Sequence, residues 1–379
     1  MRARRLFGSL LLVTALVGAV FVPAASAAAV PKWTRAKLPG LCAKHAIPVV
    51  QGSAAVSAKQ AWLVVDCQGA GEQSVVLHQV GTRWTKVAHP TSAWGQPEAL
   101  AASGPKNVWI FTSIGIWRYD GAAWHLIPPQ GLPVGGFGPG SIGVDWFVST
   151  HPVLVQSPAK AVIVGVGRNR PVVATWNGTR WTTTNLPTRS KADRASGYNT
   201  RVSISRLPGT SRYVVAYGAD TAIGSGTHWR LLPKIAGWCK HGCENQTIVA
   251  TGAKRAYLVG QDGGGSRTTY ATWNGSKWKL RPLPKLKASY GITDFVAVSR
   301  TNLEAVGYIS SGRGTRTLAL HFNGKKWKVQ KSPTPNPSAA KAIGFERVSA
   351  VWKKPGFLVS GDSFNTRTAK TTEFAYRLR

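Results

Sequence analysis

Short runs of β-branched and aromatic residues alternate with turns along the chain after residue 30. A representative stretch contains four such runs, at 248–252, 255–260, 268–273 and 278–283. Runs of this length and composition, bounded by Gly, Asn, Asp and Pro, are typical of β-strands. No window of about 11 to 18 residues in this region has helical periodicity. The pattern therefore predicts an all-β protein.

A Gly-x-x-Trp motif marks the end of each group of strands. Three of its copies carry Asn directly before the Gly, and Asn-Gly between apolar runs is a strong hairpin signal. The successive Trp residues are 40, 57, 48, 49 and 49 positions apart, which suits a propeller blade of four strands, A to D. The six copies are Gly81–Trp84, Gly121–Trp124, Gly178–Trp181, Gly226–Trp229, Gly275–Trp278 and Gly324–Trp327.

The two ends of the repeat region complement each other. The segment from Lys32 to Pro39 reads as a strand D that no strands A to C precede. The last three runs, 347–351, 357–361 and 372–379, read as strands A to C without a strand D. We therefore expect the N-terminal strand to complete the last blade, which removes an open sheet edge. Six complete units and one shared unit predict a seven-bladed β-propeller.

The turns of this chain resemble those of secreted bacterial propellers whose blades carry a W-[ND]-G-x-x-W turn, within the broad kelch and galactose-oxidase-like group. The motif occurs here as Trp176-Asn177-Gly178 before Trp181, and again as Trp273-Asn274-Gly275 before Trp278. The resemblance covers nearly all of residues 30–379. It implies the fold and no specific function, because propellers host both enzymes and binding proteins.

The N-terminal segment has the three parts of a secretory signal peptide. Three arginines within the first five residues precede an apolar run, and Ala25-Ser26-Ala27 fits a cleavage site. We expect a signal peptide over 1–27 and a single propeller over 28–379. The alternative is a membrane anchor, but no second apolar run after residue 29 is long enough to span a membrane. The expected location is extracellular, either free or associated with the cell wall.

Four cysteines in an exported chain predict two disulfides. Cys239 and Cys243 are close enough in sequence to close a small loop, and Cys42 and Cys67 would then staple the first blade. The competing interpretation is a Cys/His metal site, because a histidine lies near each pair. An oxidising environment disfavours it, and we expect no metal and no cofactor.

The charge balance is strongly positive. The chain has 48 Lys and Arg against 14 Asp and Glu, a net charge of +34, and removal of the signal-peptide arginines leaves +31. Such an excess favours anionic partners: wall polymers, acidic glycans, acidic proteins or, less favoured, nucleic acid. The alternative is a generally basic surface that serves solubility. We expect a monomer.

Loop lengths suggest where a partner binds. In a propeller the D–A and B–C loops emerge on one face and the A–B and C–D turns on the other. The long loops here are 134–147, 187–200, 234–246 and 261–267, which belong to the first face, and functional residues concentrate on long loops. The predicted binding residues on this loop face are Arg168, Arg170, Arg189, Arg194, Trp238, Lys240, Arg267, Arg313 and Arg367.

Other recurrent residues are interpreted as structural. The repeated tryptophans should pack between blades. His78 and His321 occupy matching positions, each three residues before a turn Gly, which also indicates a structural role. Four aspartates near the predicted ends of strands B should cap turns, although they could instead hold a cation or act in acid–base chemistry. These aspartates are Asp66, Asp220, Asp262 and Asp362.

The sequence contains no catalytic motif of a hydrolase nucleophile, zinc protease, P-loop or dinucleotide site. The leading hypothesis is a secreted, non-enzymatic binding module that docks an anionic partner on its basic loop face. The alternative is a secreted polysaccharide hydrolase or lyase that uses carboxylates at the channel mouth.

Overall fold

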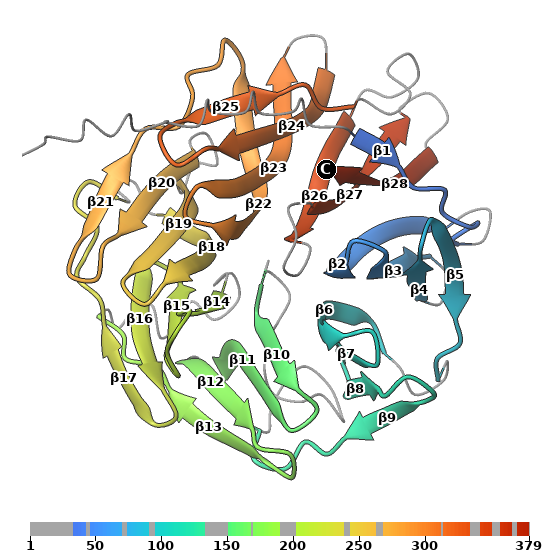
Figure 1. Cartoon of the computed structure of the whole chain (residues 1–379), viewed down its shortest axis with the longest axis horizontal. Coiled ribbons are helices and arrows are strands. Elements are labelled where there is room, and N and C mark those ends of the chain that lie inside the picture. Colours follow the sequence, from blue (N-terminus) through green and yellow to red (C-terminus); the bar gives the residue numbers. More distant parts are fainter. Residues whose placement is uncertain are drawn as a thin grey trace, which may run out of the picture. The chain divides into compact units, whose positions relative to one another are not determined.

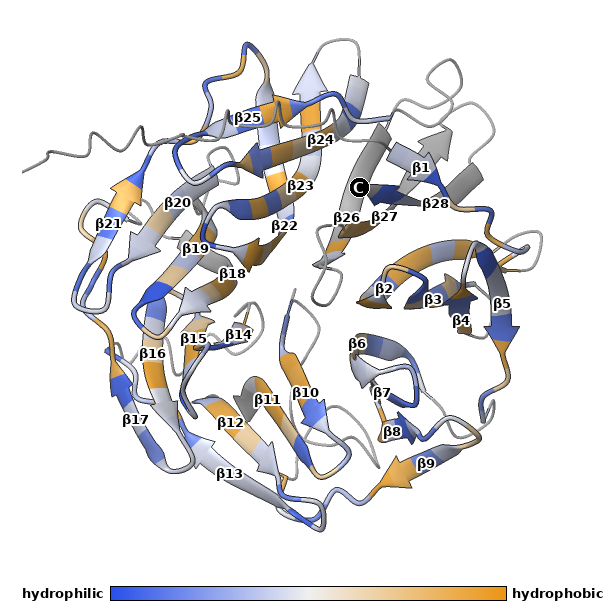
Figure 2. Cartoon of the chain, viewed as in Figure 1, coloured by the Kyte–Doolittle hydropathy of each residue, from blue (hydrophilic) through white to orange (hydrophobic). Residues whose placement is uncertain are grey.

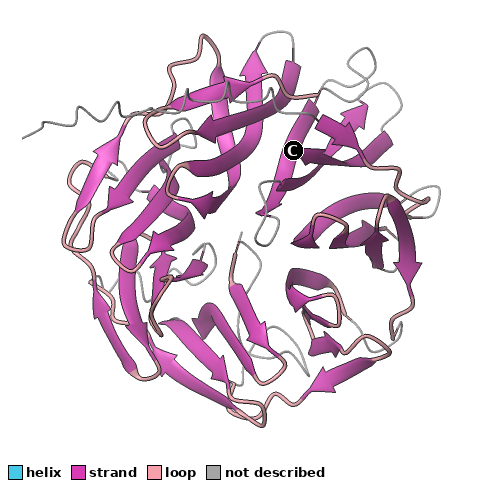
Figure 3. Ribbon diagram, in the orientation of Figure 1, coloured by secondary structure: helices cyan, strands magenta, loops and turns pink. Residues whose placement is uncertain are grey.

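The structure is a computed structural model of the chain. It describes residues 33–42, 46–69, 74–90, 95–132, 151–167, 170–189, 202–238, 243–262, 268–311, 314–333, 342–350, 357–365 and 370–378. These residues belong to a compact unit that extends from Lys32 to Arg379. Strands and turns, without a helix, make up the described part of the chain (Figure 3). No described segment forms a helix that could cross a membrane.

Seven antiparallel sheets of four strands each form a ring, so the predicted seven-bladed propeller is confirmed (Figure 1). Blade 1 contains β2 (Ile47–Ser57), β3 (Gln60–Gln68), β4 (Val75–Val80) and β5 (Arg83–Val87), and blade 2 contains β6 (Pro97–Gly104), β7 (Asn107–Thr112), β8 (Ile116–Tyr119) and β9 (Trp124–Ile127). Blade 3 contains β10 (Val153–Ser157), β11 (Lys160–Gly167), β12 (Arg170–Trp176) and β13 (Trp181–Asn185). Blade 4 contains β14 (Val202–Arg206), β15 (Tyr213–Tyr217), β16 (Asp220–Ser225) and β17 (His228–Leu231). Blade 5 contains β18 (Cys243–Gly252), β19 (Arg255–Asp262), β20 (Thr268–Trp273) and β21 (Trp278–Arg281). Blade 6 contains β22 (Ser289–Ser299), β23 (Asn302–Ser311), β24 (Gly314–Phe322) and β25 (Trp327–Gln330). Blade 7 contains β26 (Ala342–Ala350), β27 (Phe357–Asn365) and β28 (Lys370–Leu378), with β1 (Trp33–Arg35) as its fourth strand.

The N-terminal strand closes the ring as the sequence predicts. Strand β1 pairs antiparallel with β28, and Trp33 lies opposite Leu378. The Trp33 ring packs edge-on against the Tyr376 ring, with the ring centres 6.1 Å apart. Blade 7 then lies beside blade 1, because β2 contacts β26, β27 and β28. Strand D of the last blade therefore comes from the opposite end of the described chain.

The Asn-Gly turns between strands C and D are held by the Asn side chain. In blade 6, Asn323 Oδ1 accepts the backbone N–H groups of Lys325 and Lys326, each at 3.1 Å. Gly324 has φ 89°, a conformation that L side chains rarely adopt. A Cβ at Gly324 would also lie 2.5 Å from Thr301 Cγ2, in the A–B turn of the same blade. The C–D and A–B turns of a blade therefore lie against each other on one face of the ring.

The hydrophobic core is divided among the gaps between blades. One cluster joins Tyr257 and Tyr270 of blade 5 to Phe295 and Leu303 of blade 6, and comparable clusters fill the other gaps. The repeat tryptophans take part as predicted: Trp181 is 2 % exposed and belongs to the cluster between blades 2 and 3. Figure 2 shows hydrophobic stretches in strands such as β2 and β12, and a more hydrophilic β17 at the rim.

A disulfide joins Cys42 to Cys67, with the Cα atoms 5.6 Å apart, which confirms this predicted pair. Cys42 lies on the segment that connects β1 to β2, and Cys67 lies in β3 of blade 1. The bond therefore links the segment that follows β1, the closing strand of blade 7, to blade 1. Cys239 lies outside the described residues, so the second predicted pair stays a prediction.

Two details differ from the sequence-based expectation. Strand β18 begins at Cys243, five residues before the predicted start, because its first residues extend the pairing with β19 as far as Asp262. Asp220 is the first residue of the third strand of blade 4, and its prediction at the end of a strand B was wrong. The preceding strand, β15, is short and ends at Tyr217, and only a tight turn separates the two strands.

Candidate functional site

Most of the predicted loop-face residues lie outside the described part of the chain: Arg168, Arg194, Lys240, Arg267, Arg313 and Arg367. The structure describes the remaining three, Arg170, Arg189 and Trp238. Arg170 begins β12 and is exposed to solvent. A cation in this position is available to a partner.

Arg189 and Trp238 are engaged within the protein. The Arg189 guanidinium donates hydrogen bonds to the Asp220 carboxylate and to the Leu232 carbonyl, and its backbone N–H donates to Asp220 Oδ2 at 3.0 Å. Trp238 is 8 % exposed and packs in the cluster between blades 4 and 5. These contacts anchor two D–A loops to the blades.

Of the four recurrent aspartates, the structure describes the side chains of Asp66 and Asp220, and both hold neighbouring segments together. Asp66 accepts hydrogen bonds from the side-chain amides of Gln68 and Gln96, at 3.4 and 2.9 Å. Asp220 is nearly buried and binds Arg189. Asp262 and Asp362 lie in strands whose backbone is described, but their side chains are outside the described set. In the described set no cluster of three or more His, Cys, Asp or Glu residues could hold a metal ion.

His78 and His321 occupy equivalent positions in the third strands of their blades, and each contacts the residue opposite it in the second strand. His78 lies opposite Trp62 in the sheet of blade 1, and the two rings stack with centres 4.1 Å apart. His321 lies opposite Glu304 in blade 6, and its Nδ1 is 3.3 Å from Glu304 Oε2. Burial lowers the pKa of His78 and raises the pKa of Glu304 to about 7, while His321 acts in the opposite direction on Glu304. Both histidines thus support the blades, as the sequence indicates.

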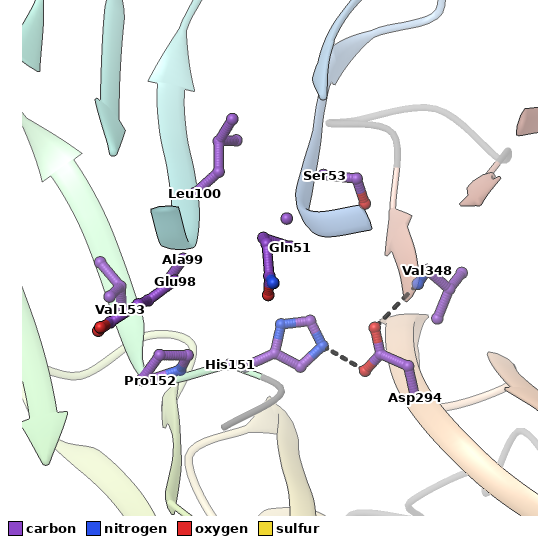
Figure 4. A pocket seen from close by; sticks show the side chains of 11 residues that line it. Gln51, Ser53, Glu98, Ala99, Leu100, His151, Pro152, Val153, Asp294 and Val348 are labelled. Carbon is purple, nitrogen blue, oxygen red and sulfur yellow. Dashed lines mark hydrogen bonds and ion pairs between the residues drawn. The ribbon is translucent and has the colours of Figure 1, made fainter. Parts of the chain in front are cut away.

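The central channel contains a small polar cavity (Figure 4). Its walls come from the innermost strands of several blades, and the side chains of Gln51, Glu98, His151 and Asp294 surround it. Asp294 is fully engaged: its carboxylate is 2.8 Å from His151 Nε2 and accepts the backbone N–H groups of Phe295 and Val348. The cavity volume is about 30 Å³, enough for a water molecule and far below the roughly 300 Å³ or more of ligand pockets.

A much larger groove lies between blades 5 and 6. Its volume is about 570 Å³, within the usual range for ligand sites. The A–B and C–D turns of both blades contribute to it, through Arg255, Asn274, Arg300 and the segment 324–326. These turns lie on the face opposite the predicted binding loops, whereas Arg281 and residues 282–284, which also line the groove, belong to the end of β21 and to the D–A segment that follows it. The groove therefore extends along the gap between the two blades.

Five cations surround this groove. None of the described residues that line it is acidic, and none of the five forms an ion pair with a described carboxylate. All five are exposed to solvent, although the Nε of Arg281 donates to Thr272 Oγ1 at 3.3 Å. The groove is therefore a site of unbalanced positive charge, formed by Arg255, Arg281, Arg300, Lys325 and Lys326.

Aromatic side chains form the walls between these cations. Tyr257, Tyr270, Trp273 and Trp327 are each no more than 8 % exposed, whereas Phe322 is half-buried. The Tyr270 and Trp327 rings meet edge-on, with centres 5.5 Å apart. The Tyr270 hydroxyl is buried beside the Trp327 indole, and its proton has no acceptor among the described residues. Burial raises the pKa of Tyr270 well above its usual value, so the hydroxyl keeps its proton and is a donor.

Sequence reasoning missed the residues of this groove. The blade 6 turn reads Asn323-Gly324-Lys325-Lys326-Trp327, so two cations stand in the repeat turn itself, and Arg255 and Arg300 stand at A–B turns. The sequence therefore shows that these turns carry cations. It does not show that the cations share one groove, because that depends on how the blades pack in the ring.

Comparison with known proteins identifies the fold of the chain. No protein-family model matches it, and no curated protein sequence matches it either. Among solved structures, YCF48 from Cyanidioschyzon merolae shares 14 % identity at a TM-score of 0.57, covering 92 % of this chain and 98 % of that one. A structure of YCF48 bound to a D1 peptide shares 15 % identity at a TM-score of 0.53, covering 91 % and 96 %.

A puromycin-hydrolysing peptidase from Mycobacterium tuberculosis has a TM-score of 0.54 with 9 % identity. The match covers 86 % of this chain but 52 % of the peptidase. At such identities the similarity shows the fold alone. The chain is thus a seven-bladed β-propeller without a specific family, as the resemblance in its turns implies.

Proposed function

We propose that this protein is a binding module that docks an anionic partner in the groove between blades 5 and 6. The observation that carries the proposal is the set of five exposed cations around a groove of about 570 Å³ that no described acidic residue lines. A concave site lined by one sign of charge concentrates ligands of the opposite sign. The net charge of +31 that remains without the signal-peptide arginines extends the attraction beyond the groove.

Two further observations support a binding role outside the cell. A solved structure of YCF48, a propeller of similar architecture, has a D1 peptide bound, so the architecture can serve recognition. The Cys42–Cys67 disulfide is compatible with an oxidising compartment, in line with the signal peptide expected over 1–27. We propose a secreted protein on these grounds.

The predicted loop face stays a second proposed surface. Of its residues, Arg170 is described and exposed, while Arg189 and Trp238 have partners within the protein. We propose that this face adds long-range attraction to the same partner. An Arg170→Glu variant tests it: weaker binding of the polyanion supports a contribution, and unchanged binding removes Arg170 from the site.

The alternative, a polysaccharide hydrolase with channel carboxylates, has less support from the described residues. The channel cavity holds about 30 Å³, and Asp294, one of the two carboxylates that line it, is occupied by His151 and two backbone N–H groups. A sugar ring does not fit such a space. The groove, in turn, offers no described carboxylate for acid–base work.

A matched pair of charge reversals tests the proposal. Arg255→Glu with Lys326→Glu changes the groove. Lys160→Glu with Arg180→Glu changes the corresponding positions of blade 3, since Lys160 also begins a strand B and Arg180 also precedes a strand D tryptophan. Both double variants change the net charge equally on the same face.

The measurement is retention on a heparin column across a salt series. Wild-type retention should fall steeply between about 50 and 200 mM salt, as expected for release of counterions. The groove variant should elute at much lower salt than the blade 3 variant. Equal elution of the two variants would show that net charge, and not the groove, governs binding.

A further inference from the structure

The hydrogen-bonding groups of the groove narrow the chemistry of its ligand. We propose that the groove takes a carbohydrate that carries a phosphate or sulfate ester, and that the Tyr270 hydroxyl donates a hydrogen bond to this ligand. This inference rests on the proposed anion-binding function and specifies its partner.

The groove is rich in donors and poor in free acceptors. Three arginines and two lysines surround it, and the Tyr270 hydroxyl adds a neutral donor. Its side-chain acceptors are already in use: Asn274 Oδ1 accepts the backbone N–H groups of Ser276 and Lys277, and Thr272 Oγ1 accepts from Arg281. The Arg300 carbonyl accepts from the Tyr257 hydroxyl at 3.3 Å. A complementary ligand must therefore bring acceptors.

Phosphate and sulfate esters meet this requirement, because their oxygens accept several hydrogen bonds and arginine forks match their geometry. An acidic peptide matches it less well. Its carboxylates would meet the cations, but its backbone N–H groups would be buried against a surface with few free acceptors, and unpaired buried donors are costly. The observations therefore favour an esterified sugar over a peptide.

The Tyr270 hydroxyl is an independent indication of a ligand. Tyr270 lines the groove, its residue is 2 % exposed, and its hydroxyl oxygen lies beside the Trp327 indole, while its proton has no acceptor among the described residues. Buried polar groups in folded proteins are nearly always paired. The hydroxyl can be paired by a ligand oxygen that reaches the bottom of the groove, and a ligand lacking such an oxygen leaves it unpaired.

An apolar ledge beside the cations suits a sugar ring. Phe322, Leu283 and Pro284 are half-buried and Pro282 is exposed in the lining, and Phe322 and Leu283 pack against the same hydrophobic cluster. Flat apolar surfaces pack against the C–H faces of pyranose rings, while the exocyclic ester reaches the cations. The same ledge gives no benefit to a bare inorganic anion.

Isothermal titration calorimetry on the full chain tests the inference. The probes are a heparin-derived tetrasaccharide, a phosphorylated oligosaccharide of the same length, an unsubstituted oligosaccharide and an oligoglutamate peptide of equal charge. Wild-type protein should bind an ester-bearing sugar, and the first two probes tell sulfate from phosphate. The unsubstituted sugar should not bind measurably, and the peptide should bind at least tenfold more weakly than the preferred ester.

Two tyrosine variants locate the hydroxyl. Tyr270→Phe should weaken binding of the preferred ester by about tenfold, the loss expected for one hydrogen bond to a charged acceptor. Its melting temperature should change little, because the proton of the removed hydroxyl has no acceptor among the described residues of the free protein. Tyr119→Phe is the matched control, since that hydroxyl donates to the Gly121 carbonyl in blade 2, and its affinity should equal that of the wild type.

The outcomes separate this inference from the proposed function. Tighter binding of oligoglutamate than of either ester would overturn the inference and leave the anion-binding groove standing. Unchanged affinity in Tyr270→Phe would remove the hydroxyl from recognition. Failure of every anionic probe to bind would overturn both the inference and the proposed function.

Discussion

His151 and Asp294 meet in the central channel, with Nε2 of the imidazole 2.8 Å from Oδ1 of the carboxylate (Figure 4). His151 lies two residues before the innermost strand of blade 3, whereas Asp294 lies in the innermost strand of blade 6. The second oxygen of Asp294 accepts the Val348 N–H of blade 7 at 2.8 Å. The contact thus joins blades that are not neighbours in the ring and closes the channel around a cavity that admits a water molecule.

Loss of this contact should weaken the ring. His151→Ala leaves the buried Asp294 carboxylate with two backbone donors, so the free energy of unfolding in urea should fall by about 1–3 kcal/mol. His125→Ala is the control, because His125 makes a comparable contact with Asp120, 2.7 Å long, at the exposed surface. Its effect should be clearly smaller. Equal losses of unfolding free energy in the two variants would show that the channel contact contributes no more to stability than an exposed contact does.

The stability of blade 6 should depend on pH through Glu304. Burial raises the pKa of this carboxyl to about 7, so its stabilising neutral form is present below the ordinary pKa of about 4.5 and is lost as the pH rises through about 7. The difference in unfolding free energy between Glu304→Gln and the wild type should therefore shift in favour of the variant by about 1–3 kcal/mol between pH 5 and pH 8. A pH-independent difference would contradict this account.

The Cys42–Cys67 disulfide should contribute to stability beyond blade 1. The bond closes a loop with a sequence separation of 25 residues, for which the loss of unfolded-state entropy is about 3 kcal/mol. The double variant Cys42→Ala with Cys67→Ala should lose roughly this amount in chemical denaturation at constant pH. A melting temperature equal to that of the wild type would show that the closing segment is held without the bond.

The closing strand offers a test of ring closure by β1. Trp33→Ala removes the edge-on contact with Tyr376 and should reduce the free energy of unfolding by about 2 kcal/mol, less than for a fully buried tryptophan because Trp33 is half-buried. Thr34→Ala on the same strand is exposed and should have little effect. Equal losses at the two positions would indicate that the tryptophan contact does not hold the strand.

Much of this fold could be predicted because each blade repeats the same local chemistry. Gly324 needs a positive φ, Asn323 caps the turn, and Trp327 fills the gap between blades, so three neighbouring residues specify one hairpin. The complementary ends gave the blade number, because Trp33 belongs to a strand D that the C-terminal unit lacks. The fold therefore follows from short-range patterns and their period.

The site could not be predicted in the same way. Long loops directed attention to Arg189 and Trp238, yet Arg189 pairs with a buried aspartate and Trp238 fills the core, contacts that depend on tertiary packing. Arg255 and Lys326 belong to short turns of different blades, and their common groove exists because blade 5 packs against blade 6. The sequence shows these cations but not their convergence.

The most direct test of the central claim is a lysine footprint of the bound protein. The chain is acetylated with and without a heparin-derived tetrasaccharide, and modification of each lysine is measured by mass spectrometry. Ligand should protect Lys325 and Lys326 in the groove while Lys160, at the corresponding face of blade 3, is modified as before. Equal protection of all three lysines, or protection confined to Lys240 of the predicted loop face, would contradict a binding groove between blades 5 and 6.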